Sequence, residues 1–544
     1  MAKPLIVALS GEICSGKTTL ARRLLQDFGF EVFSTRQVLE DLYRGKEKAS
    51  RVTLQHLGER LDDETNGLWV VRSFQEKVFP SLGQSSCCVI DAVRIPNQLV
   101  ELRRAFGPSV VHVHLVCSID TLSVRFGQKY GLNKDNGTTQ REYSVIKANS
   151  TEKQVSRLKV LADLVIDTDR SNEKDVGIRV ASYLGLLANH QRSVVDVVVG
   201  GQFGSEGKGQ ICAYLAPEYD ALVRVGGPNA GHTVFADPPQ KFHLIPSGAT
   251  RAPNALLIIG PGAVLDLTVL KKEIAESKIG TDRLKIDYNA TIITEEDKQQ
   301  EKKLVATIGS TGQGVGAATA RNIILRSAKK LNKAVKFEKL LRGYLGSAHY
   351  ELERLFRRNA KVLLEGTQGA GLSLHHGFYP YVTSRDTTVS GCLAESGIAP
   401  KRVRQIIMVT RTYPIRVQNP KDRTSGPFES SELSWEIISK RSGIPREDLE
   451  ESEMTTTTHK RRRVAEFSWA LFRKACELNS PTDIALTFVD YVSDRNEKAR
   501  RFEQLTDETI MFVEEVERCA GAPVSLISTR FQYRCIIDRR NWKC

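Results

Sequence analysis

The stretch SGEICSGKTT near the N-terminus has residue types and spacing suited to holding a nucleoside triphosphate. Its glycines, lysine and threonine fit GxxxxGK[ST], in which backbone N–H groups surround phosphates, the lysine reaches the outer phosphates and the hydroxyl contacts Mg²⁺. An apolar run, LIVAL, precedes the loop and helically spaced leucines follow it. The sequence therefore predicts a strand, an ATP-binding loop and a helix. The predicted ATP contacts are Gly11, Ser15, Gly16, Lys17, Thr18 and Thr19, with Thr18 as metal ligand.

Cationic side chains follow the other predicted strands of this region. Phosphoryl transfer needs cations around the transferred group, and Arg36, Arg94, Arg125 and Lys129 have suitable types. Asp91 ends the apolar strand CCVID, at the sheet edge where ligands of open α/β folds bind. Over roughly residues 5–190 the pattern resembles the nucleoside and deoxynucleoside monophosphate kinases. The resemblance implies acceptor or catalytic roles for Arg36, Asp91, Arg94 and Arg125.

A second glycine loop, GGQFGSEGKGQ, follows the apolar run VVDVVVG and departs from the first pattern. Gly201 and Gly207 are six apart instead of five, and Lys208 is followed by Gly209 instead of a hydroxyl residue. The loop is nevertheless suited to anions, because it combines backbone N–H groups, a lysine and the start of a helix. Its middle residue, Ser205, is the unusual feature.

The motifs after this loop occur in a specific order: GGPNAGHTV, STGQGVG, EGTQGAGLSLHHGFYPYVTSRDTT, TTTTHKRRR, LTFVD and SLISTR. Together they resemble the adenylosuccinate synthetase family across essentially all of residues 194–540. The resemblance implies an α/β fold with a large, mostly parallel central sheet. It also implies a C–N ligase, in which a nucleoside triphosphate phosphorylates O6 of a purine nucleotide and the amine of L-aspartate then displaces the phosphate.

The resemblance assigns roles to residues of these motifs. Catalytic roles fall on Ser205, His232 as general acid, and Lys208; metal contacts fall on Ser205 and Gly231. Purine nucleotide contacts are Ser205, Glu206, Asn229, Ala230, Gly231, Thr311, Gln368, Thr383 and Lys460. Aspartate contacts are Thr456, Thr457, Thr458 and Arg462. Triphosphate contacts are Gly204, Gly207, Lys208, Gly209, Arg462, Asp490, Ser528 and Thr529.

Ser205 replaces the aspartate of the family loop GQWGDEGKG, which takes the N1 proton of the purine. A serine without an activating partner does not act as that base at neutral pH. A short neutral side chain leaves space for the 2-amino group of guanine, and a phage branch of the family with this serine converts dGMP to N6-succino-2-amino-2'-deoxyadenylate. We therefore predict dGMP as substrate. The alternatives are an enzyme acting on IMP, with Glu206 swinging inward as base, and an inactive synthetase domain that senses nucleotides.

Two further departures concern the sugar and the triphosphate. His459 and Lys460 stand where the family has glycine and arginine, and the loss of a guanidinium near the ribose is compatible with a deoxyribonucleotide. The family segment TKLD, which selects GTP, reads TFVD here. We expect ATP, while the retained Asp490 leaves GTP open.

The length of the chain predicts two to four domains, and its composition is that of an ordinary globular protein. The 544 residues are 41% hydrophobic and carry a net charge of +14, which suits anionic ligands. We predict domains at 1–190 and 194–544 with a linker at 191–193. The scattered cysteines and the lack of a long apolar run predict a cytoplasmic protein without membrane or stable nucleic-acid partners. The resemblance to adenylosuccinate synthetases implies Mg²⁺ and a homodimer. In that family an arginine of one subunit reaches the nucleotide of the other, and the matching position is Leu325, with Arg326 beside it and Arg321 nearby.

Overall fold

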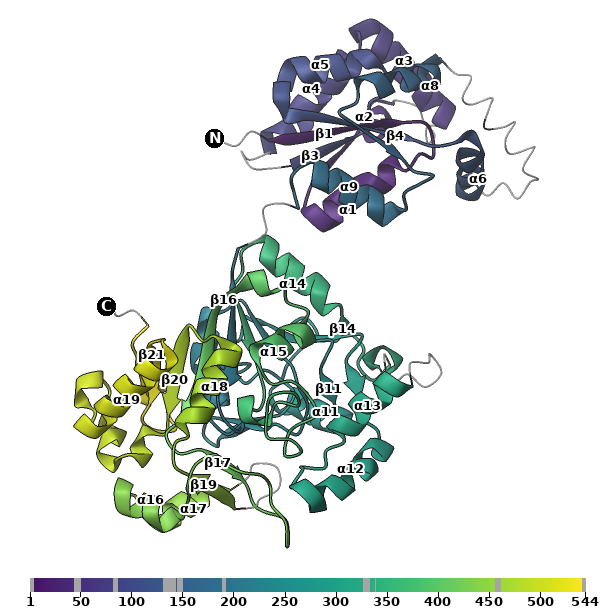
Figure 1. Cartoon of the computed structure of the whole chain (residues 1–544). Helices are drawn as coiled ribbons and strands as arrows, with labels where there is room; N and C mark the ends of the chain where they lie inside the picture. The colour runs from purple at the N-terminus through teal and green to yellow at the C-terminus, as the bar shows by residue number, and fades with distance from the viewer. Residues whose placement is uncertain are drawn as a thin grey trace. The chain divides into compact units, whose positions relative to one another are not determined.

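The computed structural model describes residues 4–43, 50–81, 87–130, 143, 150–187, 192–325, 333–337, 339–454 and 461–540. The chain forms two compact units, residues 1–189 and 190–544, which are described separately below (Figure 1). None of the helices in the described ranges is long and apolar enough to cross a membrane.

Unit 1 is built on a five-stranded parallel sheet with the order β2-β3-β1-β4-β5. The predicted parallel α/β fold is therefore confirmed. The central strand β1 is buried along most of its length, which is typical of strands covered on both faces. The strands are β1 (Leu5–Gly11), β2 (Glu31–Ser34), β3 (Cys87–Asp91), β4 (Val110–Val116) and β5 (Leu164–Asp167).

Helices cover both faces of the unit 1 sheet. Leu20 and Leu24 of α1 pack with Val176 and Val180 of α9 on one face, and α4 and α5 cover the other (Figure 1). This arrangement leaves the carboxyl edge of the sheet open for ligands. The helices are α1 (Lys17–Phe28), α2 (Thr35–Leu42), α3 (Arg51–Thr65), α4 (Leu68–Lys77), α5 (Pro96–Phe106), α6 (Ile119–Tyr130), α8 (Ser150–Val155) and α9 (Glu173–Tyr183).

Two histidines of β4 are buried beside the phosphate loop. The Ser10 hydroxyl lies 2.6 Å from His112 Nε2 and 2.7 Å from His114 Nδ1. Burial lowers the pKa of both imidazoles to about 4. His112 and His114 alternate with valines in β4, and their shared contact with Ser10 shows that both face the same layer.

These histidines should make unit 1 less stable in acid. Below their ordinary pKa of 6.5 the unfolded chain binds protons that the folded unit does not, so stability falls from about pH 6.5 towards pH 4. Each histidine can contribute a slope of up to about 1.4 kcal/mol per pH unit. Amide exchange of β1 and β4, corrected for intrinsic rates, measures this slope. It should persist in a variant of the exposed His56, His56→Asn; an unchanged protection between pH 6.5 and 4.5 would refute the expectation.

Unit 2 contains a ten-stranded sheet with the order β14-β12-β10-β7-β15-β6-β16-β20-β21-β22. Its neighbouring strands are parallel except for the antiparallel pair β21–β22, so the predicted large, mostly parallel sheet is confirmed. The strands are β6 (Val195–Gly200), β7 (Ala221–Arg224), β10 (Leu256–Ile259), β12 (Leu284–Asp287), β14 (Leu345–Gly346), β15 (Val362–Glu365), β16 (Val403–Arg411), β20 (Asp483–Thr487), β21 (Val524–Ser528) and β22 (Ile536–Asp538).

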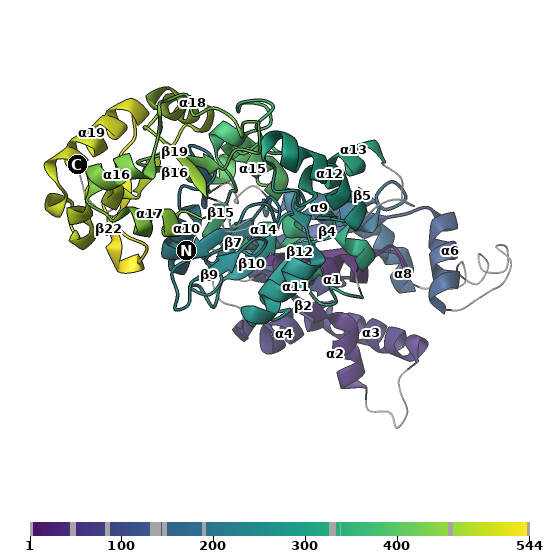
Figure 2. The ribbon, with the colours of Figure 1, turned by 90° about the horizontal axis from the view of Figure 1, so that it is seen from below.

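Smaller sheets and ten helices surround this sheet in the described part of unit 2. Figures 1 and 2 both place α19 at one end of the unit and α12 and α13 at the other. The small strands are β8 (His232–Val234), β9 (Gln240–Phe242), β11 (Val264–Leu265), β13 (Thr291–Ile292), β17 (Ile415–Val417), β18 (Glu432–Leu433) and β19 (Arg462–Ala465). The helices are α10 (Lys208–Leu215), α11 (Leu267–Glu276), α12 (Glu295–Ile308), α13 (Val315–Ile324), α14 (Ala348–Arg357), α15 (Val389–Ser396), α16 (Trp435–Ser442), α17 (Arg446–Ser452), α18 (Trp469–Asn479) and α19 (Asp507–Ala520).

The central strands of unit 2 end in residues that can do chemistry. Gly200, Arg224, Glu365, Arg411 and Thr487 are the last residues of β6, β7, β15, β16 and β20. Because these five strands are consecutive and parallel in the sheet, their last residues share one edge. Apolar clusters on both faces hold that edge in place.

Candidate active sites

The phosphate loop of unit 1 has the predicted place between β1 and α1. Gly11 and Gly16 have φ angles of 142° and 103°, and a Cβ added at Gly11 would lie 2.5 Å from the Leu115 carbonyl oxygen. Lys17 Nζ donates hydrogen bonds of 2.7 Å to the carbonyl oxygens of both Gly11 and Glu12. Burial, aided by the nearby charge of Arg94, lowers the pKa of Lys17 to about 8. The lysine is thus held at the loop, ready to exchange these carbonyls for phosphate oxygens.

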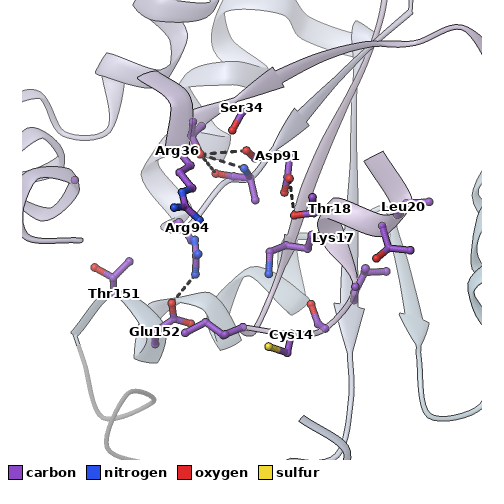
Figure 3. Close-up of a pocket in the computed structure, with 18 of the residues that line it drawn as sticks. Cys14, Lys17, Thr18, Leu20, Ser34, Arg36, Asp91, Arg94, Thr151 and Glu152 are labelled. Atoms are coloured by element: carbon purple, nitrogen blue, oxygen red, sulfur yellow. Dashed lines mark hydrogen bonds and ion pairs between the residues drawn. The ribbon is translucent and has the colours of Figure 1, made fainter. Parts of the chain in front are cut away.

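Thr18 and Asp91 meet at the mouth of this loop. The Thr18 hydroxyl donates a 2.9 Å hydrogen bond to Asp91 Oδ2, as Figure 3 shows. A hydroxyl and a carboxylate are hard oxygen donors that suit Mg²⁺, which commonly keeps several waters and takes further oxygens from phosphates. The pair therefore fits a magnesium ion brought by a nucleotide.

The predicted cations of unit 1 have different surroundings. Arg94 Nη1 lies 2.5 Å from Glu152 Oε1, whereas Arg36 is 68% exposed and pairs with Glu40 of its own helix. In Figure 3, Arg36 and Arg94 lie on one side of Asp91, and Thr18 lies on the opposite side of Asp91. Arg125 donates to the hydroxyl and carbonyl oxygens of Thr168, both at 3.0 Å, and so supports the strand end after β5.

A pocket of about 790 Å³ brings most of these residues together. Gly11 is not on its wall and acts instead on the shape of the loop. Its wall is formed by the phosphate loop, by residues of α2, α3 and α9, and by residues at and after the end of β3. The predicted residues that line it are Ser15, Gly16, Lys17, Thr18, Thr19, Arg36, Asp91, Arg94, Arg125 and Lys129.

The glycine loop of unit 2 is organised around the buried side chain of Glu206. Glu206 Oε1 accepts hydrogen bonds from the backbone N–H groups of Gln202 (3.0 Å) and Gly204 (2.8 Å). Its Oε2 forms a 2.6 Å ion pair with Lys208 Nζ, which also donates to the Gly204 carbonyl at 3.2 Å. The structure thus places Glu206, predicted to contact the purine, inside the loop. Movement toward a substrate would break all three contacts of its carboxylate.

Ser205 is connected to the predicted aspartate site through two buried residues. Its carbonyl oxygen accepts a 3.2 Å hydrogen bond from Arg411, which forms a 2.6 Å ion pair with Glu453. Glu453 also pairs with Arg462 at 3.1 Å. Burial alone would raise the pKa of Glu453, but Arg411 and Arg462 together hold it at about 2. This carboxylate therefore couples the Ser205 loop to Arg462.

His232 belongs to a buried network of charged groups. Its Nδ1 makes a short hydrogen bond with Glu365, and Arg224 Nη1 lies 2.6 Å from the same carboxylate. Ser247 adds a backbone N–H donor at 2.7 Å. Burial and, next, Arg224 lower the pKa of His232 to about 4, so the imidazole is neutral at pH 7. Since Nδ1–H donates to Glu365, Nε2 is the free ring nitrogen, and it is buried without a hydrogen-bond partner in the described part of unit 2.

Sequence analysis missed Arg224, Glu365, Arg411 and Glu453. The first three share one signal, since each is a charged residue at the end of an apolar strand. Arg224 and Glu365 are register partners in β7 and β15, although they are far apart in the chain. Such a strand-end charge in a parallel sheet points to the ligand edge.

A smaller cavity of about 200 Å³ gathers many predicted ligand residues of unit 2. Asn229 Nδ2 lies 3.4 Å from Thr383 Oγ1, while Asn229 Oδ1 is buried without a hydrogen-bond partner. An orphaned amide oxygen in a cavity suits a donor from a bound ligand. The predicted residues on this wall are Gly204, Ser205, Asn229, Ala230, Gly231, Thr311, Gln368, Thr383 and Arg462. Ser205 and Gly231 offer oxygen ligands there that fit Mg²⁺, although Ser205 lacks the charge of a carboxylate.

The remaining predicted triphosphate residues lie outside the walls of this cavity. A Cβ at Gly207 would lie 3.6 Å from the ring of Phe488, so the loop touches the segment before Asp490. Burial raises the pKa of Asp490 to about 7, and its Oδ1 has no hydrogen-bond partner. Ser528 ends β21 and Thr529 follows it, with the Thr529 hydroxyl donating to the Cys535 carbonyl at 3.1 Å. Gly209 is the second residue of α10 and lies beside His232, since an added Cβ would be 2.7 Å from the His232 Cβ.

Part of the predicted aspartate and dimer residues lie outside the described residues. These are Thr456, Thr457, Thr458, His459 and Lys460, together with Arg326. Leu325 directly follows α13, and Arg321 forms a 2.7 Å ion pair with Asp297 of the same chain.

Comparison with known proteins assigns the family. The family model "Adenylosuccinate synthetase" matches residues 197–327 and 320–497. The adenylosuccinate synthetase of Methanocaldococcus jannaschii is 38% identical over 356 residues, covering 63% of this chain and 96% of the relative. That of Pyrococcus horikoshii is 37% identical over 355 residues, covering 63% and 98%. The chain belongs to the adenylosuccinate synthetase family and is, at that level, a C–N ligase.

Two solved structures share the fold. A fully ligated adenylosuccinate synthetase from Plasmodium falciparum has a TM-score of 0.55 at 22% identity, covering 64% of this chain and 100% of its own. The succinoaminodeoxyadenylate synthetase of cyanophage S-2L, bound to dGMP and to dATP as an energy donor, has a TM-score of 0.53 at 25% identity, covering 64% and 96%.

Proposed function

We propose that unit 2 joins L-aspartate to C6 of dGMP, with hydrolysis of ATP, to give N6-succino-2-amino-2'-deoxyadenylate. The observation that carries this proposal is Ser205, a short neutral residue on the wall of the ligand cavity within an otherwise intact loop. A carboxylate at that position would crowd the 2-amino group of guanine, and a serine leaves it room. The S-2L synthetase bound to dGMP supports the proposal by analogy.

The reaction runs in two displacements. O6 of the base attacks the γ-phosphorus, the bond to the β-phosphate oxygen breaks and ADP leaves, while the N1 proton passes to solvent water. The aspartate amine then adds to C6 and inorganic phosphate departs with O6. Lys208 and the backbone N–H groups of the loop stabilise the transferred phosphoryl group, and Mg²⁺, when held by Ser205 and the Gly231 carbonyl, would add positive charge. We assign His232 to the O6 side as general acid. In this role Nε2 first takes up a proton from solvent, Glu365 as counter-ion stabilises the imidazolium, and Glu365 and Arg224 orient the ring.

Glu206 does not replace the missing base in this proposal. Its carboxylate is bonded to two backbone N–H groups and to Lys208. Recruiting it to N1 would remove the lysine's own counter-charge and open the phosphate loop at the moment of transfer. The fixed position of Glu206 therefore favours dGMP as substrate over IMP with Glu206 as the base.

We propose ATP or dATP as the energy donor. The Arg411 guanidinium lies 3.8 Å from the centre of the Phe488 ring, in a segment where the GTP-using family has lysine. Asp490 has a pKa of about 7 and is partly protonated at neutral pH. A protonated carboxyl can donate to a ring nitrogen of adenine, whereas reading guanine's N–H groups needs the carboxylate.

Incubation of the full chain with dGMP, aspartate, ATP and Mg²⁺ tests this function. A product with the mass of N6-succino-2-amino-2'-deoxyadenylate should form, and its formation should require aspartate. Absence of this product with either ATP or GTP would overturn the proposal.

For unit 1 we propose transfer of the γ-phosphoryl group of ATP to a nucleoside monophosphate. The supporting observation is one pocket whose wall combines a phosphate loop, a Thr18–Asp91 pair suited to Mg²⁺, and the arginines Arg36, Arg94 and Arg125. The two activities would make the chain bifunctional. We also propose that unit 2 forms a homodimer, as in its family.

The two activities should be separable by matched lysine variants. Lys17→Met is expected to reduce phosphorylation of deoxynucleoside monophosphates at least about 100-fold, since the lysine stabilises the transferred group, and to leave ligase activity unchanged. Lys208→Met should do the reverse. Separate assays of diphosphate and succinylated product measure this; equal loss of both activities in either variant would contradict it.

A further inference from the structure

One face of α3 contributes part of the wall of the unit 1 pocket. Gln55, Gly58 and Asp62 follow the spacing i, i+3, i+7, which places them in one row along a helix. All three line the pocket. Polar side chains two turns apart thus flank a glycine, and this row shares the pocket wall with Arg94, the cation suited to the acceptor's phosphate.

Gly58 leaves a bare patch on this helix. A glycine inside a helix costs about 1 kcal/mol relative to alanine. A Cβ here would meet only Leu39 Cδ1, at 3.5 Å, which is an ordinary contact. Neither the backbone nor a neighbouring side chain requires glycine at this position. The space that the missing side chain leaves opens into the pocket, where a flat ligand can lie against the helix.

Asp62 presents a fixed carboxylate to this patch. Its Oδ1 accepts from Trp69 Nε1 at 2.7 Å and from Gln98 Nε2 at 2.8 Å. Gln98 Oε1 in turn accepts from the backbone N–H of Arg94 at 2.7 Å. Two donors on one oxygen use its lone pairs and leave Oδ2 for N–H donors of a ligand. The same network ties the carboxylate to the loop that carries the phosphate-binding arginine.

Gln55 supplies the complementary group. Its Nε2 is buried and has no hydrogen-bond partner among the residues that the structure describes. A buried amide donor without a partner is costly unless a ligand supplies an acceptor. The row therefore offers one acceptor and one donor on either side of a flat apolar patch.

We propose that Gln55, Gly58 and Asp62 form the nucleobase subsite of unit 1 and that its acceptor is a purine nucleoside monophosphate with a 2-amino group. The inference rests on the proposed kinase function. Guanine and 2,6-diaminopurine both supply an N2 amino group for Asp62 and an N7 acceptor for Gln55. N2 and N7 lie on opposite edges of the base, which suits two groups that are two helical turns apart on α3. Adenine carries its amino group on the same edge as N7 and cannot span the two in this way. In the reaction an oxygen of the acceptor phosphate bonds to the γ-phosphorus, the bond to the β-phosphate oxygen breaks, and ADP leaves.

A panel of acceptors tests the subsite in the full chain. With ATP and Mg²⁺ but without aspartate, formation of diphosphates is measured for dGMP, 2-amino-2'-deoxyadenylate, dAMP, dIMP, dCMP and dTMP. We expect kcat/KM for dGMP or 2-amino-2'-deoxyadenylate, or for both, to exceed that of the other four acceptors at least about tenfold. The ratio of kcat/KM between these two nucleotides shows which of them is the preferred acceptor. Equal or better use of dAMP, dIMP or a pyrimidine nucleotide would overturn the subsite while leaving the kinase function intact.

Variants make the test specific. Asp62→Asn keeps the shape and the Trp69 and Gln98 contacts, yet should lower kcat/KM for 2-aminopurine acceptors at least about tenfold. Gly58→Leu should block the patch. Asp63→Asn, one residue along and exposed, is the matched control and should have no effect. Unchanged kcat/KM in Asp62→Asn would overturn the assignment.

Absence of phosphoryl transfer to every acceptor would refute the kinase function instead. Amide exchange of residues 51–65 in the full chain with dGMP and 2-amino-2'-deoxyadenylate then decides on the subsite. Protection that is lost in Asp62→Asn would support it, and no protection would overturn it.

Discussion

Replacing Ser205 by aspartate is expected to lower kcat/KM for dGMP at least about 100-fold and to bring activity toward IMP. The carboxylate would restore a base for the N1 proton of hypoxanthine, which carries only hydrogen at C2. The same group would crowd the 2-amino group of guanine. Because Ser205 is held through its backbone carbonyl by Arg411, the exchange of side chain should leave the loop in place.

The matched control for this exchange is Ser205→Ala. Alanine also leaves room for the 2-amino group, so selectivity for dGMP over IMP should persist even where the rate falls. Steady-state kinetics with dGMP and with IMP give the ratio of the two kcat/KM values for each variant. Retention of full dGMP activity in Ser205→Asp would show that this position does not select the substrate.

Replacing His232 by alanine is expected to reduce kcat of the ligase reaction by about 10²- to 10⁴-fold. Its Nε2 is buried and without a hydrogen-bond partner, and Glu365 and Arg224 fix the ring. The loss should appear in kcat, because the charge that His232 meets develops during the reaction. Calorimetry of dGMP binding should change far less.

Ser247→Ala provides the control for this network. Ser247 donates to Glu365 through both its backbone N–H and its hydroxyl, and the variant keeps the backbone bond and the Arg224 pair. A loss below about tenfold is expected. If His232→Ala retained wild-type kcat, this residue would not take part in the reaction.

Local patterns were sufficient to predict the fold class and the position of both loops. Lys17 and Thr18 follow a strand and begin a helix, and the order of motifs after residue 194 matches one family. Such features depend on neighbours in sequence, so periodicity and turn residues reveal them. Asn229, Thr311 and Thr383, assigned by resemblance, line one cavity.

The long-range charge networks could not be predicted in this way. Glu365 orients His232 from a strand 133 residues away, and Arg411 reaches the Ser205 carbonyl from a residue 206 positions further on. The direction of Glu206, which turns into its loop, follows from the ion pair with Lys208 and from backbone donors. None of these pairings is encoded in local spacing, because each depends on the order of strands in the sheet.

The most direct test of the central claim is a competition between dGMP and IMP. The wild-type full chain is given both nucleotides at equal concentration with aspartate, ATP and Mg²⁺, and the two succinylated products are separated by mass. We expect N6-succino-2-amino-2'-deoxyadenylate to exceed adenylosuccinate at least about tenfold. Predominance of adenylosuccinate would contradict the proposed substrate and the role given to Ser205.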